Sequence, residues 1–182
     1  MRRRTVILGL SGLALGALPL GARVAPVPAG RSLEAIRGEW RRFVPSGAEV
    51  TLSTQPLELA PQVWRERLTD AQYVVLREAG TEKPFTSALN EEKRVGLYVC
   101  RGCDLPLFTS EMKYDSGTGW PSFFTHIPEH FATKRDFKLI WPRTEYHCVR
   151  CGGHHGHVFD DGPPPTGERW CNNGVALRFI PL

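Results

Sequence analysis

The sequence predicts a mainly β domain that follows a helical N-terminal arm. After residue 95, short β-branched and aromatic runs alternate with turn residues, a pattern typical of antiparallel sheets. Before Gly80, apolar residues instead recur at helical spacing. Two Cys-x-x-Cys pairs lie far apart within the β part, and they indicate a metal site that staples the fold.

Residues 1–29 have the composition of an export signal. Three arginines precede a mostly apolar stretch over residues 5–20, and small residues follow it. The pair Arg3-Arg4 makes the segment similar to a twin-arginine signal. A retained membrane anchor is the alternative, but three glycines and Pro19 interrupt the stretch. We therefore expect an exported, periplasmic protein.

The positive charge of the chain belongs to this first segment. The chain has 23 basic and 19 acidic residues, a formal net charge of +4. Residues 1–29 hold four arginines and no acid, so the remainder carries 19 residues of each sign. A near-neutral protein lacks the field that attracts nucleic acid, and we expect no such partner. The remaining chain of about 153 residues is long enough for one domain with a sizeable core, which we expect to be a monomer.

Residues 30–63 are expected to form a lead-in arm that packs on the domain. The arm is rich in Pro, Gly and Ala, and it contains one plausible short helix over residues 33–43. The apolar residues that recur there at helical spacing are Leu33, Ile36, Trp40 and Phe43.

A second helix is expected after Thr69. Thr69 and Gln72 have the spacing of a capping box, and Leu68 with Tyr73 would form a hydrophobic staple across the helix start. Gly80 is the expected stop, because glycine commonly ends helices.

Five strands are expected from β-branched and aromatic runs bounded by Gly, Pro, Asp and Asn. They are GLYVC (96–100), PLFTS (106–110), FKLIW (137–141), EYHCVR (145–150) and VALRFI (175–180). By contrast, the glycines and prolines of CGGHHGHVFDDGPPP (151–165) predict a loop.

The two cysteine pairs, Cys100 with Cys103 and Cys148 with Cys151, predict a tetrahedral Zn²⁺ site. A single pair could also be a redox couple, but two pairs favour the metal. The 44 residues between the pairs exceed the about 15–20 residues of a compact zinc ribbon. The zinc would therefore join two distant hairpins, and four thiolates leave no position for a substrate, so its role would be structural.

Cys171 is the fifth cysteine and remains outside the zinc set. If its segment is one strand, period-two geometry places Arg169, Cys171 and Asn173 on one face. The cation should then depress the pKa of the thiol, and the amide of Asn173 could orient a substrate or a histidine. The alternative is a small buried hydrophobe, as most free cysteines are.

A polar cluster follows the second cysteine pair. It contains His154, His155 and His157 with Asp160 and Asp161. Histidine is the usual proton carrier near neutral pH, so this cluster could supply acid–base chemistry to Cys171. A second metal site and a solvated polar turn are the alternatives.

Trp120 lies in a glycine-rich turn, in YDSGTGWPSFFTH. A tryptophan in such a turn is often a packed anchor, and it is equally suited to form the wall of a pocket for an apolar group. The sequence leaves both interpretations open.

Four motifs occur together in residues 64–182: SGTGWPSF, the paired Cys-x-x-Cys, CGGHHGHVFDDGP and RWCNNGVALRF. In this combination the chain resembles the methionine-R-sulfoxide reductases of the B type. The resemblance implies two antiparallel β-sheets with short N-terminal helices packed outside, and a structural Cys₄ zinc. Residues 1–63 lie outside it.

The resemblance also implies roles for individual residues. Cys171 matches the nucleophile, and Trp120 matches the residue that receives the substrate methyl group. His154 and His157 match the histidines that bind and protonate the sulfoxide oxygen. The supporting residues implied are Asp161, Arg169 and Asn173. The expected reaction converts methionine-R-sulfoxide in peptides or proteins to methionine, leaving a sulfenic acid on Cys171.

Two departures from the family pattern accompany this likeness. His155 and Trp170 stand where many members have Leu and Tyr, and we expect them to affect packing more than chemistry. Thr118 stands where many members have a second, resolving cysteine. With four of five cysteines on zinc, the sulfenic acid would need an external thiol such as a thioredoxin-like protein. The competing hypothesis is a non-catalytic, zinc-stapled β module that binds a protein partner, with Cys171 buried.

Overall fold

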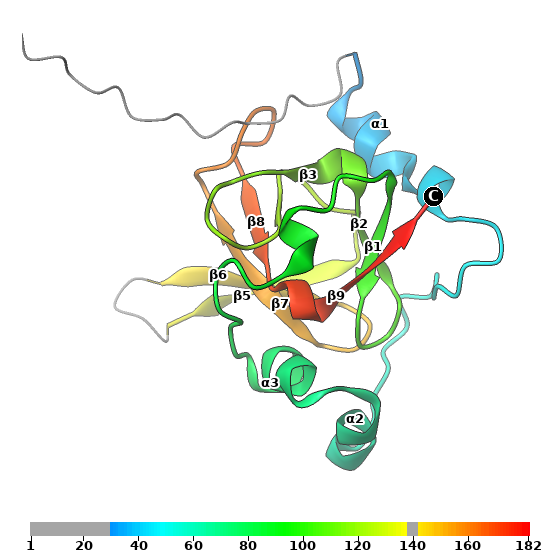
Figure 1. Cartoon of the computed structure of the whole chain (residues 1–182), viewed down its shortest axis with the longest axis vertical. Helices are drawn as coiled ribbons and strands as arrows, with labels where there is room; N and C mark the ends of the chain where they lie inside the picture. Colours follow the sequence, from blue (N-terminus) through cyan, green and yellow to red (C-terminus); the bar gives the residue numbers. More distant parts are fainter. Residues whose placement is uncertain (1–29, 138–141) are drawn as a thin grey trace, which may run out of the picture.

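The computed structural model describes residues 30–137 and 142–182, and these form a mainly β domain, as predicted (Figure 1). The predicted export signal lies outside the described residues. Two antiparallel sheets make the core, with strand orders β2-β1-β9 and β3-β4-β8-β7-β6-β5. The strands are β1 (Gly96–Cys100), β2 (Pro106–Thr109), β3 (Lys113–Tyr114), β4 (Ser122–Phe123), β5 (Phe131–Asp136), β6 (Arg143–Cys148), β7 (His154–Phe159), β8 (Arg169–Asn172) and β9 (Leu177–Pro181).

The helices are short and lie outside the sheets. Figure 1 shows α1 at the top of the view and α2 and α3 at the bottom, with the strands between them. No helix in the described part of the chain is long and apolar enough to cross a membrane. The helices are α1 (Leu33–Gly38), α2 (Pro61–Arg67) and α3 (Asp70–Glu78), and the 3₁₀ turns are η1 (Trp40–Phe43), η2 (Ala88–Asn90), η3 (Ser110–Met112) and η4 (Gly174–Ala176).

Aromatic side chains from both sheets meet in the core. The Phe108 ring of β2 stacks on the Phe123 ring of β4, with centroids 3.9 Å apart and an interplanar angle of 7°. Tyr98 of β1 meets the same Phe123 ring edge-on at 5.1 Å. All three residues are fully buried, so the two sheets share one apolar core.

The predicted helix over residues 33–43 is present in two pieces. The Ser32 hydroxyl caps α1 by accepting a hydrogen bond from the Ala35 amide. The chain leaves the α conformation at Glu39 and continues as the tighter turn η1. Such 3₁₀ turns are common at α-helix ends, because they satisfy the carbonyls that the last helical turn leaves unbonded.

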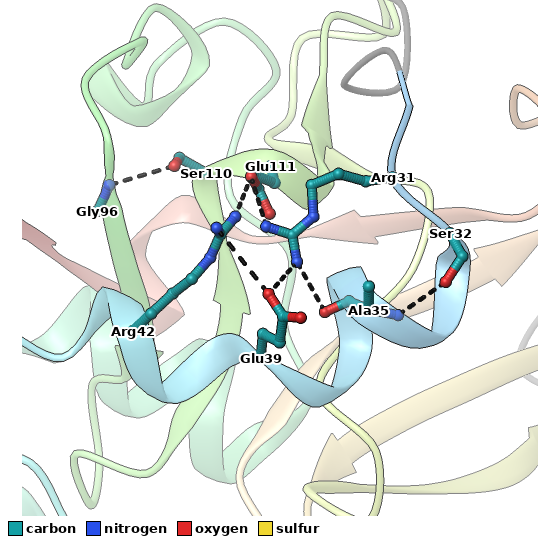
Figure 2. A network of polar contacts seen from close by, with 8 residues as sticks. All are labelled: Arg31, Ser32, Ala35, Glu39, Arg42, Gly96, Ser110 and Glu111. Carbon is teal, nitrogen blue, oxygen red and sulfur yellow. Dashed lines mark hydrogen bonds and ion pairs between the residues drawn. The ribbon is translucent and has the colours of Figure 1, made fainter.

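The N-terminal arm packs on the β domain mainly through apolar side chains. Ile36, Trp40 and Phe43 are buried, and burial of such a side chain contributes about 1.5–3 kcal/mol. Figure 2 shows polar contacts of the same arm, in which Arg31 and Arg42 meet Glu39 of the arm and Glu111 of η3. These ion pairs are partly exposed, and such pairs contribute about 0–1 kcal/mol each, so burial dominates.

Helix α3 begins as predicted and ends differently. The capping box is confirmed, because the Thr69 hydroxyl accepts from the Gln72 amide and the Gln72 side chain accepts from the Thr69 amide. The left-handed residue at the end is Ala79, with φ 52°, and not Gly80. Gly80 serves a close approach instead, since a Cβ there would lie 2.6 Å from a methyl carbon of Val74.

The predicted strand FKLIW (137–141) falls mostly on residues 138–141, which lie outside the described residues. The strand that ends just before it, β5 (Phe131–Asp136), was not predicted. This strand is the edge of its sheet and exposes its middle residues, so it lacks the apolar pattern that marks buried strands. VALRFI begins with η4 and becomes a strand only at Leu177.

The condition that Arg169, Cys171 and Asn173 lie on one strand is met only for the first two residues. The chain leaves β8 at Asn173, turns through η4 and enters the other sheet as β9. A Cβ on Gly174 would lie 1.9 Å from the Ser87 hydroxyl oxygen, so the crossing needs a glycine. Arg169 and Cys171 therefore share a strand, and Asn173 reaches the same region from the turn.

The loop predicted over residues 151–165 is also wrong in its first half, where His154–Phe159 form β7 between β6 and β8. Gly156 belongs to this strand for a steric reason. A Cβ on it would lie 1.9 Å from the Cys171 carbonyl oxygen, so only glycine allows the two strands to lie this close.

Candidate active site

The four paired cysteines come together as predicted. Their thiol sulfurs are buried and all lie within 4.8 Å of one another. The close contacts cross between the motifs: Cys100 to Cys151 is 3.6 Å, and Cys103 to Cys148 is 3.6 Å. A regular tetrahedron with Zn–S bonds of about 2.3 Å has edges of about 3.8 Å. The thiol cluster therefore fits a four-coordinate metal ion.

Two similar turns present these thiols, one from each sheet. Cys100 ends β1 and Cys148 ends β6, and each carbonyl accepts a hydrogen bond from the amide four residues later. The two amides belong to Asp104 and Gly152, and both residues are left-handed, with φ 58° and 66°. The thiol cluster thus joins the two sheets at their turns.

His155 supports the cluster from within the core. Its side chain is fully buried, and its Nε2 lies 3.4 Å from the Cys100 sulfur. Burial lowers the pKa of His155 to about 4, so the ring is neutral at pH 7. Trp170 is also buried, so both residues that depart from the family pattern lie in the packed interior.

Cys171 and His157 are direct partners across β7 and β8. Facing residues of an antiparallel pair carry their side chains on the same face, with Cβ atoms about 4.5–5.5 Å apart. The same row continues to Ser122 of β4 on one side and Glu145 of β6 on the other. The sheet therefore brings together a thiol and an imidazole that are 14 positions apart in the chain.

A pocket of about 110 Å³ opens over this pair. Cys171 is half-buried within it and not enclosed in the core, which disfavours the hypothesis of an inert thiol. Trp120 forms part of its wall, with its indole N–H donating to the Glu82 carbonyl oxygen at 3.1 Å. The lining residues are Thr81, Trp120, Arg143, Gly156, His157, Phe159, Cys171, Asn172 and Asn173.

The pKa of Cys171 differs from the expectation. Burial raises the pKa of this thiol above its usual range. The charge of Arg169, and hydrogen bonds from Thr118 and Arg169, offset only part of that rise. Arg169 thus acts in the predicted direction, but the predicted net depression is wrong because the pocket desolvates the sulfur.

Arg169 is held in place beside the thiol. Its guanidinium forms a bidentate pair with the Asp161 carboxylate, at 2.7 and 2.9 Å, and lies over the Phe159 ring at 4.3 Å. The pair lowers the pKa of Asp161, so the carboxylate stays charged at neutral pH. Asp161 is largely exposed, whereas the Arg169 side chain is only 10% exposed.

The two histidines of the cluster have different surroundings. His157 Nε2 lies 2.8 Å from an Asp136 oxygen, and His154 Nδ1 lies 3.0 Å from a Glu145 oxygen. Their ring centroids are 5.5 Å apart. His157 lines the pocket, while His154 is buried beside it. Burial lowers the pKa of His157 more than the Asp136 bond raises it, so this imidazole is neutral at pH 7.

Asp136, Glu145 and His157 also bring ligand atoms within 4.8 Å of one another. This grouping is where a second metal site, one of the alternatives for the histidine cluster, would lie. The carboxylates already have cationic partners within the protein: Asp136 pairs with Arg143 at 2.7 Å, and Glu145 with Lys134 at 3.1 Å. The grouping is therefore satisfied as a hydrogen-bonded support for the histidines.

Asn173 and Glu82 tie the pocket walls together. The Asn173 side chain donates to the His155 carbonyl oxygen and accepts from the Glu82 amide, both at 2.9 Å. The Glu82 carboxylate accepts hydrogen bonds from the Gly174 and Val175 amides, the latter at 3.0 Å. Sequence reasoning missed Glu82, because its partners are about 90 residues away and no local pattern marks it.

Thr118 stands close to the thiol, on a loop of linked hydroxyls. Its hydroxyl lies 2.8 Å from that of Ser116, which lies 2.7 Å from that of Ser122, the strand partner of Cys171. All five cysteines are free thiols in the structure. The loop therefore places a hydroxyl, and no sulfur, against Cys171.

Comparison with known proteins places residues 68–181 in a family model described as the SelR domain. The peptide methionine sulfoxide reductase MsrB of Hahella chejuensis is 53% identical over 119 residues, 65% of this chain and 86% of that protein. MsrB of Agrobacterium fabrum is 52% identical over 120 residues, 65% and 89% of the two chains. The chloroplastic peptide methionine sulfoxide reductase B1 of Arabidopsis thaliana is 48% identical over 125 residues, 68% and 62%.

Proposed function

The chain belongs to the methionine-R-sulfoxide reductase B family, and from this premise we propose that it reduces methionine-R-sulfoxide in peptides or proteins to methionine. It is an oxidoreductase acting on sulfur. The observation that carries the proposal is the pairing of Cys171 with His157 in a pocket that has Trp120 in its wall. The small pocket suits a methyl sulfoxide, with the indole against the methyl group and the polar residues toward the oxygen.

The chemical step moves one oxygen atom. The Cys171 sulfur attacks the sulfoxide sulfur, which carries partial positive charge. The S–O bond of the substrate breaks, and the oxygen ends on Cys171 as a sulfenic acid while methionine leaves as the thioether. Cys171 is oxidised by two electrons and the methionine sulfur is reduced by two, so no other oxidant or reductant enters this step.

The proton for the oxygen comes from the thiol itself. Because a carboxylate can only accept, the proton of neutral His157 lies on Nε2 toward Asp136, and Nδ1 is an acceptor. His157 takes the Cys171 proton at Nδ1 and delivers it to the sulfoxide oxygen, so it acts as base and then as acid. Glu145 holds the His154 ring, which provides a second imidazole next to that of His157.

The remaining site residues stabilise this arrangement. Arg169 favours the thiolate against the desolvation of the pocket, and Asp161 fixes the direction of its guanidinium. Asn173 holds the β7 backbone at His155, two residues before His157. Trp120 and Asn173 are in turn linked through Glu82.

The metal of the Cys₄ cluster is proposed to be Zn²⁺. Four buried thiols and no carboxylate form the ligand set that zinc prefers in structural sites. Cys100, Cys103, Cys148 and Cys151 would hold it, and the ion would supply folding energy and no catalytic step.

Regeneration of Cys171 is proposed to need an external thiol. One reductant thiol attacks the sulfenic acid, which forms a mixed disulfide and releases water. A second thiol of the reductant then displaces Cys171 and leaves the reductant as a disulfide. The hydroxyl of Thr118 cannot attack the sulfenic acid and form a disulfide as a thiol would. A thioredoxin-like dithiol protein is therefore the expected class of partner.

Export to the periplasm is proposed from residues 1–29 alone, on their arginines, apolar stretch and small residues. A twin-arginine route suits a protein that folds around a metal before it crosses the membrane. Replacing Arg3-Arg4 by Lys-Lys should leave the precursor in the cytoplasm; normal appearance of the mature protein in the periplasm would count against this route.

The central test is an assay with separated epimers of a peptide methionine sulfoxide and a dithiol reductant. The wild-type enzyme should reduce the R epimer and leave the S epimer unchanged. Cys171→Ser should abolish reduction and retain the metal and the fold, as metal content and circular dichroism would report. Substantial activity of the serine variant, or equal reduction of both epimers, would refute the proposed function.

A further inference from the structure

Phe85 is an exposed aromatic residue on the segment between α3 and η2. Its side chain is 73% exposed, the largest fraction among the large apolar side chains of residues 30–137 and 142–182. Its backbone is left-handed, with φ 63°, a conformation that bulky residues rarely adopt. Both features are unfavourable for the isolated protein, since the backbone is strained and the ring remains in water.

The contacts of Phe85 fix the ring against the turn that carries Trp120. The Phe85 amide donates to the Gly119 carbonyl oxygen at 2.7 Å, and the Asn90 side chain donates to the same oxygen at 2.9 Å. A Cβ on Gly119 would lie 2.9 Å from two carbons of the Phe85 ring. The ring is thus packed on the backbone of the residue that precedes Trp120.

The same segment builds the catalytic pocket. Thr81 lines the pocket, and the Glu82 carbonyl oxygen accepts the indole N–H of Trp120 at 3.1 Å. Trp120 lines that pocket and also a hollow of about 40 Å³ that it shares with Phe85 and Pro121. The exposed ring is therefore continuous with the substrate site through Trp120.

We propose that Phe85 binds an apolar side chain next to the methionine sulfoxide of a polypeptide substrate. The inference rests on the proposed function, because it needs a sulfoxide side chain in the pocket beside Trp120. An extended polypeptide advances about 3.3 Å per residue, so the neighbours of the oxidised methionine lie at the rim of the pocket. A free amino acid has no such neighbour and gains nothing from the ring.

The test compares three substrates with the full-length enzyme. They are free methionine-R-sulfoxide, a peptide with the sulfoxide residue between glycines, and a peptide with it between leucines. The wild-type enzyme should have its highest kcat/KM on the leucine-flanked peptide. Phe85→Ala should lower that value about tenfold more than it lowers the value for the free amino acid, the size expected for losing one apolar contact. Phe85→Leu should retain most of the preference.

Leu52→Ala is the matched control, since Leu52 is a 54% exposed apolar residue on the N-terminal arm and should change none of the three values. Thermal unfolding of each variant separates folding effects from binding. Equal effects of Phe85→Ala on all three substrates would overturn the inference and leave the proposed function intact. So would an effect only on the concentration dependence of the reductant, which would assign the ring to reductant docking. No reduction of any substrate by the wild type would refute the proposed function itself.

Discussion

Replacing Arg169 by alanine should make Cys171 less reactive, and the size of the effect follows from its surroundings. Burial raises the pKa of this thiol, and Arg169 is the first of the groups that oppose the rise. A hydrogen bond to a charged group contributes about 1.5–3 kcal/mol, and each 1.4 kcal/mol is a factor of about ten. Asp161 neutralises part of the guanidinium charge, so the lower end of that range applies. At a fixed neutral pH we therefore expect alkylation of Cys171 to slow about tenfold.

The assay is the rate of Cys171 alkylation by iodoacetamide in the metal-loaded protein, followed from pH 6 to pH 10 by mass spectrometry. Since the pKa of the wild-type thiol is raised, its rate should still be increasing above the range where an ordinary thiol levels off. Arg169→Ala should move the whole curve to higher pH. Asp161→Asn is the control: it removes a negative charge that raises the pKa, so its curve should stay in place or move to lower pH. An unchanged or faster rate in Arg169→Ala would show that the cation does not stabilise the thiolate.

Three further outcomes are expected. Cys148→Ser should yield protein without bound metal and without a cooperative thermal transition. Binding of structural zinc contributes about 10–16 kcal/mol, which is comparable to the whole free energy of unfolding of a domain. A folded, metal-free variant would contradict this. Glu82→Gln should lower thermal stability, by about 1–3 kcal/mol for amides that lose a charged acceptor. It should also raise KM, because the weaker side-chain bonds hold less firmly the Glu82 backbone carbonyl that accepts from Trp120; wild-type stability and KM would exclude the positioning role. Without reductant, the enzyme should release about one methionine per chain and leave a sulfenic acid on Cys171; a disulfide between Cys171 and a zinc cysteine, with metal release, would show that the metal site supplies the resolving thiol.

Local signals explain which parts of the fold the sequence predicted correctly. The capping box of α3 needs only residues three positions apart, and the cysteine turns need only their own spacing and a following glycine or aspartate. β7 and β5 depend on distant neighbours instead. Gly156 is in a strand because the Cys171 carbonyl oxygen passes close to it, and β5 pairs with β6 although its middle residues are exposed. Composition alone therefore assigned β7 to a loop and overlooked β5.

The candidate site shows the same limit more sharply, because its chemistry depends on opposing effects that only the fold determines. The sequence correctly places Arg169 two residues from Cys171 on one strand, and its charge does favour the thiolate. The sign of the net pKa change depends on how far the fold desolvates the sulfur, in a pocket lined by segments as distant in the chain as Thr81 and Asn173. His157 shows the same balance with the opposite direction of shift, since burial outweighs its bond to Asp136, lowers the pKa of the imidazole and keeps it neutral. A protonated thiol beside a neutral imidazole holds the one proton that the sulfoxide oxygen must receive, so the two shifts that the sequence could not predict are the ones that suit the pair to the reaction.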